Sequence, residues 1–279
     1  MSTVRTIDTK DYDTFRKFLQ DACGILLGDN KQYLVTSRLN KIMAQHSMTT
    51  LGELIKAITS QPRSGLKEAV VDAMTTNETL WFRDIHPFNI LQNQLLPELS
   101  KSLGGQQLKI WSAACSTGQE PYSISMIIDE FKKKSPGAFR AGERIVATDI
   151  SATVLNNARS GEYEMLALGR GLSQDRLTKF FLQTGDGRWA VKAPIKQRVD
   201  FRPMNLLHSY SMLGKFDIVF CRNVLIYFSA DLKKDILTRI HGVLKPGGYL
   251  FLGASEALSN MPDLYEMVQC RPGIIYRAK

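Results

Sequence analysis

Residues 108–121 read Leu-Lys-Ile-Trp-Ser-Ala-Ala-Cys-Ser-Thr-Gly-Gln-Glu-Pro, and this stretch decides the fold. Its first six residues form a largely apolar, β-prone run, which predicts a buried strand. A turn of small residues follows from Ala114 to Gly118, and Pro121 then opens a helical pattern that continues to Lys134. A strand, a tight turn and a helix in this order predict one unit of an α/β fold.

The same alternation continues toward the C-terminus. From about Gln92 onward, short apolar runs alternate with helical patterns, which is typical of a parallel sheet with crossover helices. The expected strands are 108–113, 144–148, 216–221 and 248–253, and the expected helices are 121–134, 152–160 and 229–244. Around Arg271-Pro272-Gly273, the residues 264–270 and 274–277 predict a terminal hairpin.

Two regions depart from this alternation. Residues 161–202 contain the hairpin signal Thr184-Gly185-Asp186-Gly187 between short apolar runs, which predicts a small antiparallel β insert at about 165–202. Near the N-terminus, apolar residues recur at helical spacing in four runs, at 12–22, 34–43, 51–58 and 66–74. We therefore expect an N-terminal helical domain over 1–88 and a Rossmann-like domain over 89–279.

Composition and charge limit the function. With 44% hydrophobic and 23% charged residues, the chain can bury a large core, while its polar start and the lack of long apolar runs predict a cytoplasmic protein that is not inserted in a membrane. The net charge of +9 suits an acidic partner such as nucleic acid. However, residues 159–202 alone hold nine Lys/Arg against five Asp/Glu, so the excess is partly local.

Candidate ligand-binding residues follow three of the expected strands. The loop 114–118 lacks the glycine pattern of dinucleotide sites and the Gly-Lys-Ser/Thr of phosphate loops, which leaves a ligand such as S-adenosylmethionine. Asp149 ends the next strand, where its carboxylate can accept hydrogen bonds from both ribose hydroxyls of a bound nucleoside. Alternatively, Asp149 only caps the helix that begins near Ala152. Asn223 follows the strand 216–221 and is either a ligand-binding amide or an ordinary turn residue.

The string Thr75-Thr76-Asn77-Glu78-Thr79-Leu80-Trp81-Phe82-Arg83 joins the two expected domains. Its polar groups, aromatic pair and arginine could close a cleft. Alternatively, Thr76 or Asn77 caps a helix, Trp81 and Phe82 form a core between domains, and Arg83 is solvated.

Five segments in order resemble the CheR-type chemotaxis receptor glutamate methyltransferases. They are Thr76-Asn77-x-Thr79-x-x-Phe82-Arg83, Trp111-Ser112-Ala113-Ala114-Cys115-Ser116-Thr117-Gly118-x-Glu120-Pro121-Tyr122-Ser123, Asp149-Ile150, Asn205-Leu206-Leu207 and Phe220-Cys221-Arg222-Asn223-Val224-x-Ile226-Tyr227-Phe228. The resemblance implies an S-adenosylmethionine-dependent enzyme that yields S-adenosylhomocysteine and methylates glutamates in the cytoplasmic domains of chemotaxis receptors. It also implies recruitment to membrane receptor arrays.

The resemblance further implies the roles of individual residues. The implied cofactor contacts are Asn77, Thr79, Arg83, Glu120, Asp149, Asn205, Leu206, Asn223 and Val224. Arg83 and Tyr227 are the expected catalytic residues, and Arg38 and Lys41 are the expected receptor contacts on the helical domain. In some family members the insert binds a receptor tail peptide by strand addition; here the hairpin turn is short, so the basic insert could instead meet acidic receptor surface.

The implied reaction requires neither a general base nor a metal. A glutamate carboxylate is already a nucleophile at neutral pH, so receptor methylation requires no general base. We expect no metal because the histidines and cysteines are not clustered.

Two other functions stay open at this point. A nucleic-acid methyltransferase is the main alternative, although Arg222-Asn223-Val224 stands where such enzymes place a Pro-Pro-aromatic element or use a catalytic cysteine. A cofactor-binding adaptor without activity is the third possibility.

Overall fold

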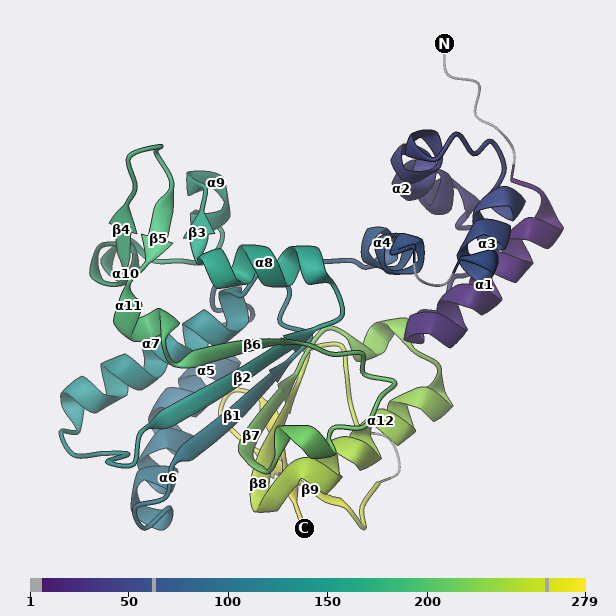
Figure 1. Cartoon of the computed structure of the whole chain (residues 1–279). Coiled ribbons are helices and arrows are strands. Elements are labelled where there is room, and N and C mark those ends of the chain that lie inside the picture. The colour runs from purple at the N-terminus through teal and green to yellow at the C-terminus, as the bar shows by residue number, and fades with distance from the viewer. Residues whose placement is uncertain (1–6, 62–63, 259–260) are drawn as a thin grey trace. The chain divides into compact units, whose positions relative to one another are not determined.

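The computed structural model describes residues 7–61, 64–258 and 261–279. The chain forms two compact units, one of Met1–Thr76 with Tyr227–Lys233 and the other of Asn77–Ile226 with Lys234–Lys279 (Figure 1). The division therefore falls after Thr76, before the boundary expected at residue 88, and a short segment from the second half of the chain joins the first unit. Within the described ranges, no helix is both long and apolar enough to cross a membrane.

The first unit contains the four predicted helices. They are α1 (Thr9–Cys23), α2 (Gln32–Gln45), α3 (Leu51–Ser60) and α4 (Leu66–Met74). Each helix buries an apolar face, and side chains cap the starts of α1 and α3. The side chain of Asp8 accepts hydrogen bonds at the start of α1, and Thr50 with Glu53 forms a capping box on α3.

A seven-stranded sheet in the order β6-β2-β1-β7-β8-β10-β9 forms the centre of the second unit. Strands β6, β2, β1, β7 and β8 pair in parallel, and the terminal hairpin of β9 and β10 adds antiparallel strands. This confirms the α/β prediction. The strands are β1 (Leu108–Ala113), β2 (Glu143–Asp149), β6 (Val199–Pro203), β7 (Phe216–Cys221), β8 (Leu244–Leu252), β9 (Tyr265–Gln269) and β10 (Ile274–Ala278).

Alternating strand residues build cores on both faces of the sheet. Ile110, Ile218 and Phe220 belong to one apolar cluster with the segment 86–102 and α7. On the opposite face, Trp111 packs against Tyr210 with ring centroids 5.0 Å apart. The remaining longer elements are α5 (His86–Ile90), a π-helical turn (Leu91–Leu95), α6 (Leu96–Ser102), α7 (Gln119–Lys134), α8 (Ala152–Ser160) and α12 (Ala230–Val243), with 3₁₀ turns at Ser211–Leu213 and Leu225–Tyr227.

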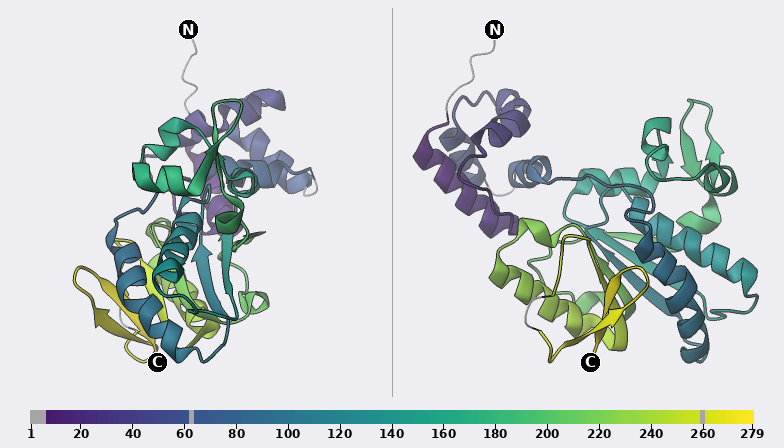
Figure 2. Two further views of the ribbon diagram at one scale, coloured as in Figure 1. Left: turned by 90° about the vertical axis from the view of Figure 1, so that its left-hand side faces the viewer. Right: turned by 180° about the vertical axis from the view of Figure 1, so that it is seen from behind.

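A small antiparallel sheet forms the predicted insert, whose β4–β5 hairpin extends away from the large sheet (Figure 2). The insert ends earlier than residue 202, because β6 (Val199–Pro203) belongs to the large sheet. Its base is fixed to the core: a Cβ on Gly171, which has a φ of +97°, would lie 2.1 Å from the carbonyl oxygen of Trp81. Its elements are β3 (Glu162–Tyr163), α9 (Met165–Leu168), α10 (Gln174–Phe180), β4 (Phe181–Gln183), β5 (Trp189–Val191) and α11 (Ala193–Lys196).

Candidate cofactor site

Strands β1, β2 and β7 are neighbours in the sheet, so their carboxyl ends meet at one edge. In open α/β sheets, ligands bind at this edge, where the strand order reverses. The loop after β1 is tightly folded, with positive φ angles at Ala114 (58°), Ser116 (50°) and Gly118 (94°). Non-glycine residues adopt this conformation at a cost, and such residues concentrate at functional sites.

Asp149 links the loop after β1 to the end of β2. Its carboxylate accepts hydrogen bonds from the backbone N–H groups of Ser116 (2.8 Å) and Ser151 (3.0 Å). The cap of α8 is a different side chain, because Ser151 Oγ accepts the N–H of Val154. The alternative in which Asp149 only caps that helix is therefore wrong, and its carboxylate instead fixes the candidate ligand-binding loop.

The same loop holds the segment that follows α4. Ser116 Oγ donates to the carbonyl of Asn77 at 2.8 Å. The backbone N–H of Met204 donates to the carbonyl of Asp149 at 2.9 Å, which brings the stretch beginning at Asn205 to the end of β2. The structure thus brings together three predicted cofactor contacts, Asn77, Asp149 and Asn205.

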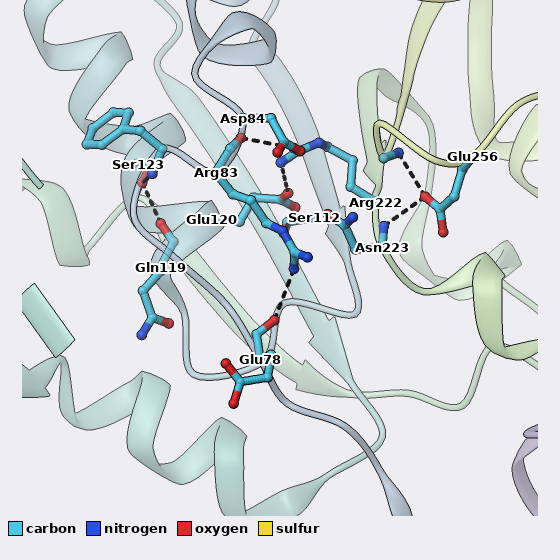
Figure 3. A network of polar contacts seen from close by, with 12 residues as sticks. Glu78, Arg83, Asp84, Ser112, Gln119, Glu120, Ser123, Arg222, Asn223 and Glu256 are labelled. Carbon is cyan, nitrogen blue, oxygen red and sulfur yellow. Dashed lines mark hydrogen bonds and ion pairs between the residues drawn. The ribbon is translucent and has the colours of Figure 1, made fainter. Parts of the chain in front are cut away.

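A buried arginine organises the end of β7 (Figure 3). The Arg222 side chain is only 1% exposed and forms ion pairs with Asp84 (2.7 Å) and Glu120 (3.0 Å). It also donates to the carbonyl of Arg83 at 2.9 Å, while Ser112 Oγ donates to the other Glu120 oxygen at 2.8 Å. Because a buried charge requires partners, these contacts fix the Glu120 carboxylate and the backbone at Arg83 together.

The segment around Arg83 has an unusual backbone. Phe82, Asp84 and Ile85 all have positive φ angles, and Arg83 itself is half-buried and donates to the carbonyl of Glu78 at 3.1 Å. Trp81 packs edge-on against Tyr163 and Phe181, within the core of the second unit. Trp81 and Phe82 are thus core residues of the second unit, and Arg83 is only partly solvated.

Sequence reasoning missed Glu256, which lies four residues beyond the end of β8. Its carboxylate accepts the backbone N–H groups of Asn223 (2.7 Å), Gly253 (2.8 Å) and Ile226 (3.3 Å) (Figure 3). Asn223 has a left-handed backbone with a φ of 59°, so it is indeed a turn residue. An acidic residue just past a buried strand, at the same sheet edge as Asp149, was the signal available in the sequence.

Two family models match the chain. "CheR methyltransferase, all-alpha domain" matches residues 10–75, and "CheR methyltransferase, SAM binding domain" matches residues 77–274, where SAM denotes S-adenosylmethionine. The chain belongs to the CheR methyltransferase family. The border between the two matches coincides with the division of the CheR chain into two units after Thr76.

Several bacterial proteins named chemotaxis protein methyltransferase are similar over nearly the whole chain. Chemotaxis protein methyltransferase 1 of Pseudomonas aeruginosa is 66% identical over 269 residues, covering 96% of this chain and 98% of the relative. Chemotaxis protein methyltransferase Cher2 of Pseudomonas putida is 65% identical with the same coverage. Chemotaxis protein methyltransferase 1 of Vibrio cholerae is 52% identical over 277 residues, covering 99% of this chain and 100% of the relative.

The hydrogen-bond acceptors of this CheR site fit S-adenosylmethionine, whose ammonium and ribose hydroxyl groups require acceptors. A carboxylate can accept about four hydrogen bonds, and Ser112 and Arg222 supply two to Glu120, whose side chain is 13% exposed. Asp149 provides a second carboxylate at the end of the neighbouring strand. The other residues predicted to contact the cofactor are Asn77, Thr79, Arg83, Asn205, Leu206, Asn223 and Val224.

The predicted catalytic Tyr227 and the predicted receptor contacts belong to the helical unit of the CheR chain. The carbonyl of Tyr227 accepts the backbone N–H of Leu26 at 2.9 Å. Arg38 donates to the carbonyls of Met74 (2.6 Å) and Thr75 (2.9 Å) at the end of α4, so it stabilises a helix terminus. Lys41 is exposed on the same helix, α2.

The cysteines of this CheR chain are all unbridged and buried. Burial raises the pKa of the Cys115 and Cys221 thiols well above the ordinary value, and the nearby carboxylates of Asp149 and Glu256 respectively raise it further. A buried neutral thiol is a poor nucleophile, so the surroundings of these two cysteines do not favour the attack on a base that some nucleic-acid methyltransferases use. In the described parts of the chain, no three His, Cys, Asp or Glu side chains are arranged to hold a metal ion.

Proposed function

We propose that this protein transfers a methyl group from S-adenosylmethionine to glutamate carboxylates in the cytoplasmic domains of chemotaxis receptors, giving methyl esters and S-adenosylhomocysteine. The observation that carries the proposal is the bonded set at the carboxyl edge of the sheet, where Arg222 fixes Glu120 and Asp149 fixes the loop after β1. Membership of the CheR methyltransferase family supports the same reaction and does not favour nucleic acid as the substrate.

The chemistry requires positioning more than acid–base catalysis. When bound, the sulfonium cofactor supplies an activated methyl group. A glutamate has an ordinary pKa of about 4.3, so it is an anion at neutral pH and no residue must remove a proton. The task of the protein is to align the carboxylate for in-line displacement and to exclude water.

Arg83 is the proposed orienting cation for this carboxylate. Its backbone is held by Arg222 at 2.9 Å, and its guanidinium donates to the carbonyl of Glu78. A preorganised guanidinium can bind a carboxylate with two parallel hydrogen bonds. Tyr227 is the proposed second residue that flanks the methyl group.

Receptor docking is assigned to the helical unit. On α2, Lys41 offers an exposed positive charge, whereas Arg38 is engaged with the end of α4 and contributes mainly by holding that helix. The basic insert is a second contact for acidic receptor surface or for a tail peptide. Docking of this kind would recruit the protein to receptor arrays at the membrane.

The test is a transfer assay with methyl-labelled S-adenosylmethionine, chemoreceptor cytoplasmic fragments and RNA. We expect base-labile label on receptor glutamates, and a loss of at least about tenfold in S-adenosylhomocysteine affinity in Asp149→Ala, equal to about 1.4 kcal/mol. Asp263→Ala, an exposed aspartate after β8, is the matched control and should bind normally. Label on RNA, or cofactor binding without any transfer, would overturn the proposal.

A further inference from the structure

One carboxylate, that of Glu256, holds three backbone donors from two different strand ends. Oε2 accepts the N–H groups of Asn223 at 2.7 Å and Gly253 at 2.8 Å, and Oε1 accepts that of Ile226 at 3.3 Å. Hydrogen bonds to an ionised acceptor are shorter and about twice as strong as neutral ones. Glu256 thereby joins the turn after β7 to the turn after β8 (Figure 3).

The turn after β7 needs such support because its backbone is unfavourable. Asn223 has a φ of 59°, a conformation that costs most residues about 1 kcal/mol or more and that asparagine tolerates best. The direction of its side chain depends on this conformation. A fixed acceptor for the Asn223 N–H stabilises the turned backbone relative to an extended one.

The end of β8 is shaped to receive this turn. A Cβ on Gly253 would lie 2.7 Å from Glu256 Oε2 and 2.8 Å from both the backbone nitrogen and Nδ2 of Asn223. Real Cβ atoms do not make contacts this short, so only glycine permits the approach. The Asn223 side chain therefore lies directly against the backbone that Glu256 holds.

We infer that Glu256 is a positioning residue of the cofactor site, acting through Asn223. The inference rests on the proposed function, because it takes Asn223 as a cofactor contact. Glu256 sets the backbone of residues 223–226 and with it the direction of the Asn223 amide. Loss of the carboxylate leaves three N–H groups without this acceptor and releases the turn.

The test measures S-adenosylhomocysteine binding by calorimetry, without receptor. Glu256→Ala should weaken binding by about tenfold or more, whereas Glu256→Gln, whose amide oxygen can still accept the two shorter bonds, should lose about threefold. Glu266→Ala, which removes an exposed carboxylate on β9, should stay within twofold of the wild type. Normal affinity in Glu256→Ala, even with a lowered melting temperature, would reduce Glu256 to a structural role and overturn the inference.

A double-mutant cycle with Asn223→Ala identifies the route of the effect. If Glu256 acts through Asn223, the loss caused by Glu256→Ala should shrink by at least half in the Asn223→Ala background. Equal losses in both backgrounds would overturn the inference. In the transfer assay, Glu256→Ala should raise KM for S-adenosylmethionine and leave KM for the receptor fragment unchanged; failure of the wild type to methylate receptors would instead contradict the proposed function.

Discussion

The helical unit and the carboxyl edge of the large sheet use polar residues in opposite ways. In the helical unit, polar side chains satisfy nearby helix ends, as Asp8 does for α1 and Thr50 for α3. At the sheet edge, the buried Arg222 side chain joins residues that lie more than one hundred positions away in the sequence. The helix caps thus join neighbouring residues, whereas the contacts of Arg222 join distant parts of the chain.

Backbone strain follows the same division. Among the residues that the structure describes, eight non-glycine residues have positive φ, and six of them lie around the candidate site: Phe82, Asp84, Ile85, Ala114, Ser116 and Asn223. The helical unit contains only Ser47 of this set. Strained backbone persists where the surrounding structure enforces it, and here it is concentrated at the candidate site.

The largest expected effect is at Arg222. Arg222→Met leaves the Asp84 and Glu120 carboxylates without their buried cation, which should lower the free energy of unfolding by about 3–5 kcal/mol. Urea unfolding measures the change. Arg188→Met, whose side chain is 51% exposed, should cost less than about 0.5 kcal/mol.

A second variant separates charge from packing at Arg222. If uncompensated charge causes the loss, the triple variant Arg222→Met/Asp84→Asn/Glu120→Gln should recover much of the stability, because no unpaired charge remains. An equally unstable triple variant would mean that the shape of the arginine matters more. The stability of the sheet edge would then depend on the packing of the Arg222 side chain and not on its charge.

An intermediate effect is expected at Glu130, whose side chain pairs with Arg176 at 2.9 Å and is 14% exposed. Burial alone would raise the pKa of this carboxyl, but the hydrogen bond and charge of Arg176 outweigh it and lower the pKa. The stability that this pair provides is therefore fully present above the unfolded pKa of about 4.3 and is lost as the pH falls through the folded value.

Glu130→Gln should thus cost about 1–2 kcal/mol at pH 7, and the difference from the wild type should shrink as the pH falls below about 4. Urea unfolding at a series of pH values measures both. A difference that does not change with pH would show that the charge of Glu130 contributes nothing to the stability.

The smallest expected effect is in the helical unit. Thr50→Ala removes one half of the capping box on α3 and should cost about 1 kcal/mol without any change in S-adenosylhomocysteine affinity. Thermal unfolding and calorimetry measure the two quantities. Thr59→Ala on the same helix, where the hydroxyl bonds only to carbonyls of the preceding turn, should be nearly neutral. Weakened cofactor binding in Thr50→Ala would contradict the view that this cap affects stability alone.

Elements with a strong local pattern could be predicted from the sequence. The bounds of β1 and β7 agree with their apolar runs, because buried parallel strands are apolar on both faces. In β6, only Val199 and Phe201 are apolar among charged neighbours, so an edge strand resembled part of the insert. The helical stretch 86–102, which contains a π-helical turn, was also not predicted.

Residues of the candidate site could likewise be predicted only where a strong local pattern marks their position. Asp149 and Asn223 could be found because Asp149 ends a strand with a clear pattern and Asn223 lies two residues beyond another. Asp84 and Glu256 were not identified. Glu256 does stand just past a strand, but its contacts with Asn223 and Ile226, like the contact of Asp84 with Arg222, join residues that are distant in the sequence. Their roles depend on the tertiary structure alone.

The close contact of Gly171 with Trp81 determines how the insert can be exchanged between proteins. At the tip of the hairpin, Gly185 and Gly187 have no atoms near the position of a Cβ, so a graft can replace or lengthen this turn. At the base, the carbonyl of Trp81 leaves no space for any side chain on residue 171. The recognition surface proposed on the insert can therefore diversify through the tip, while the base that adjoins the candidate cofactor-binding segment stays fixed.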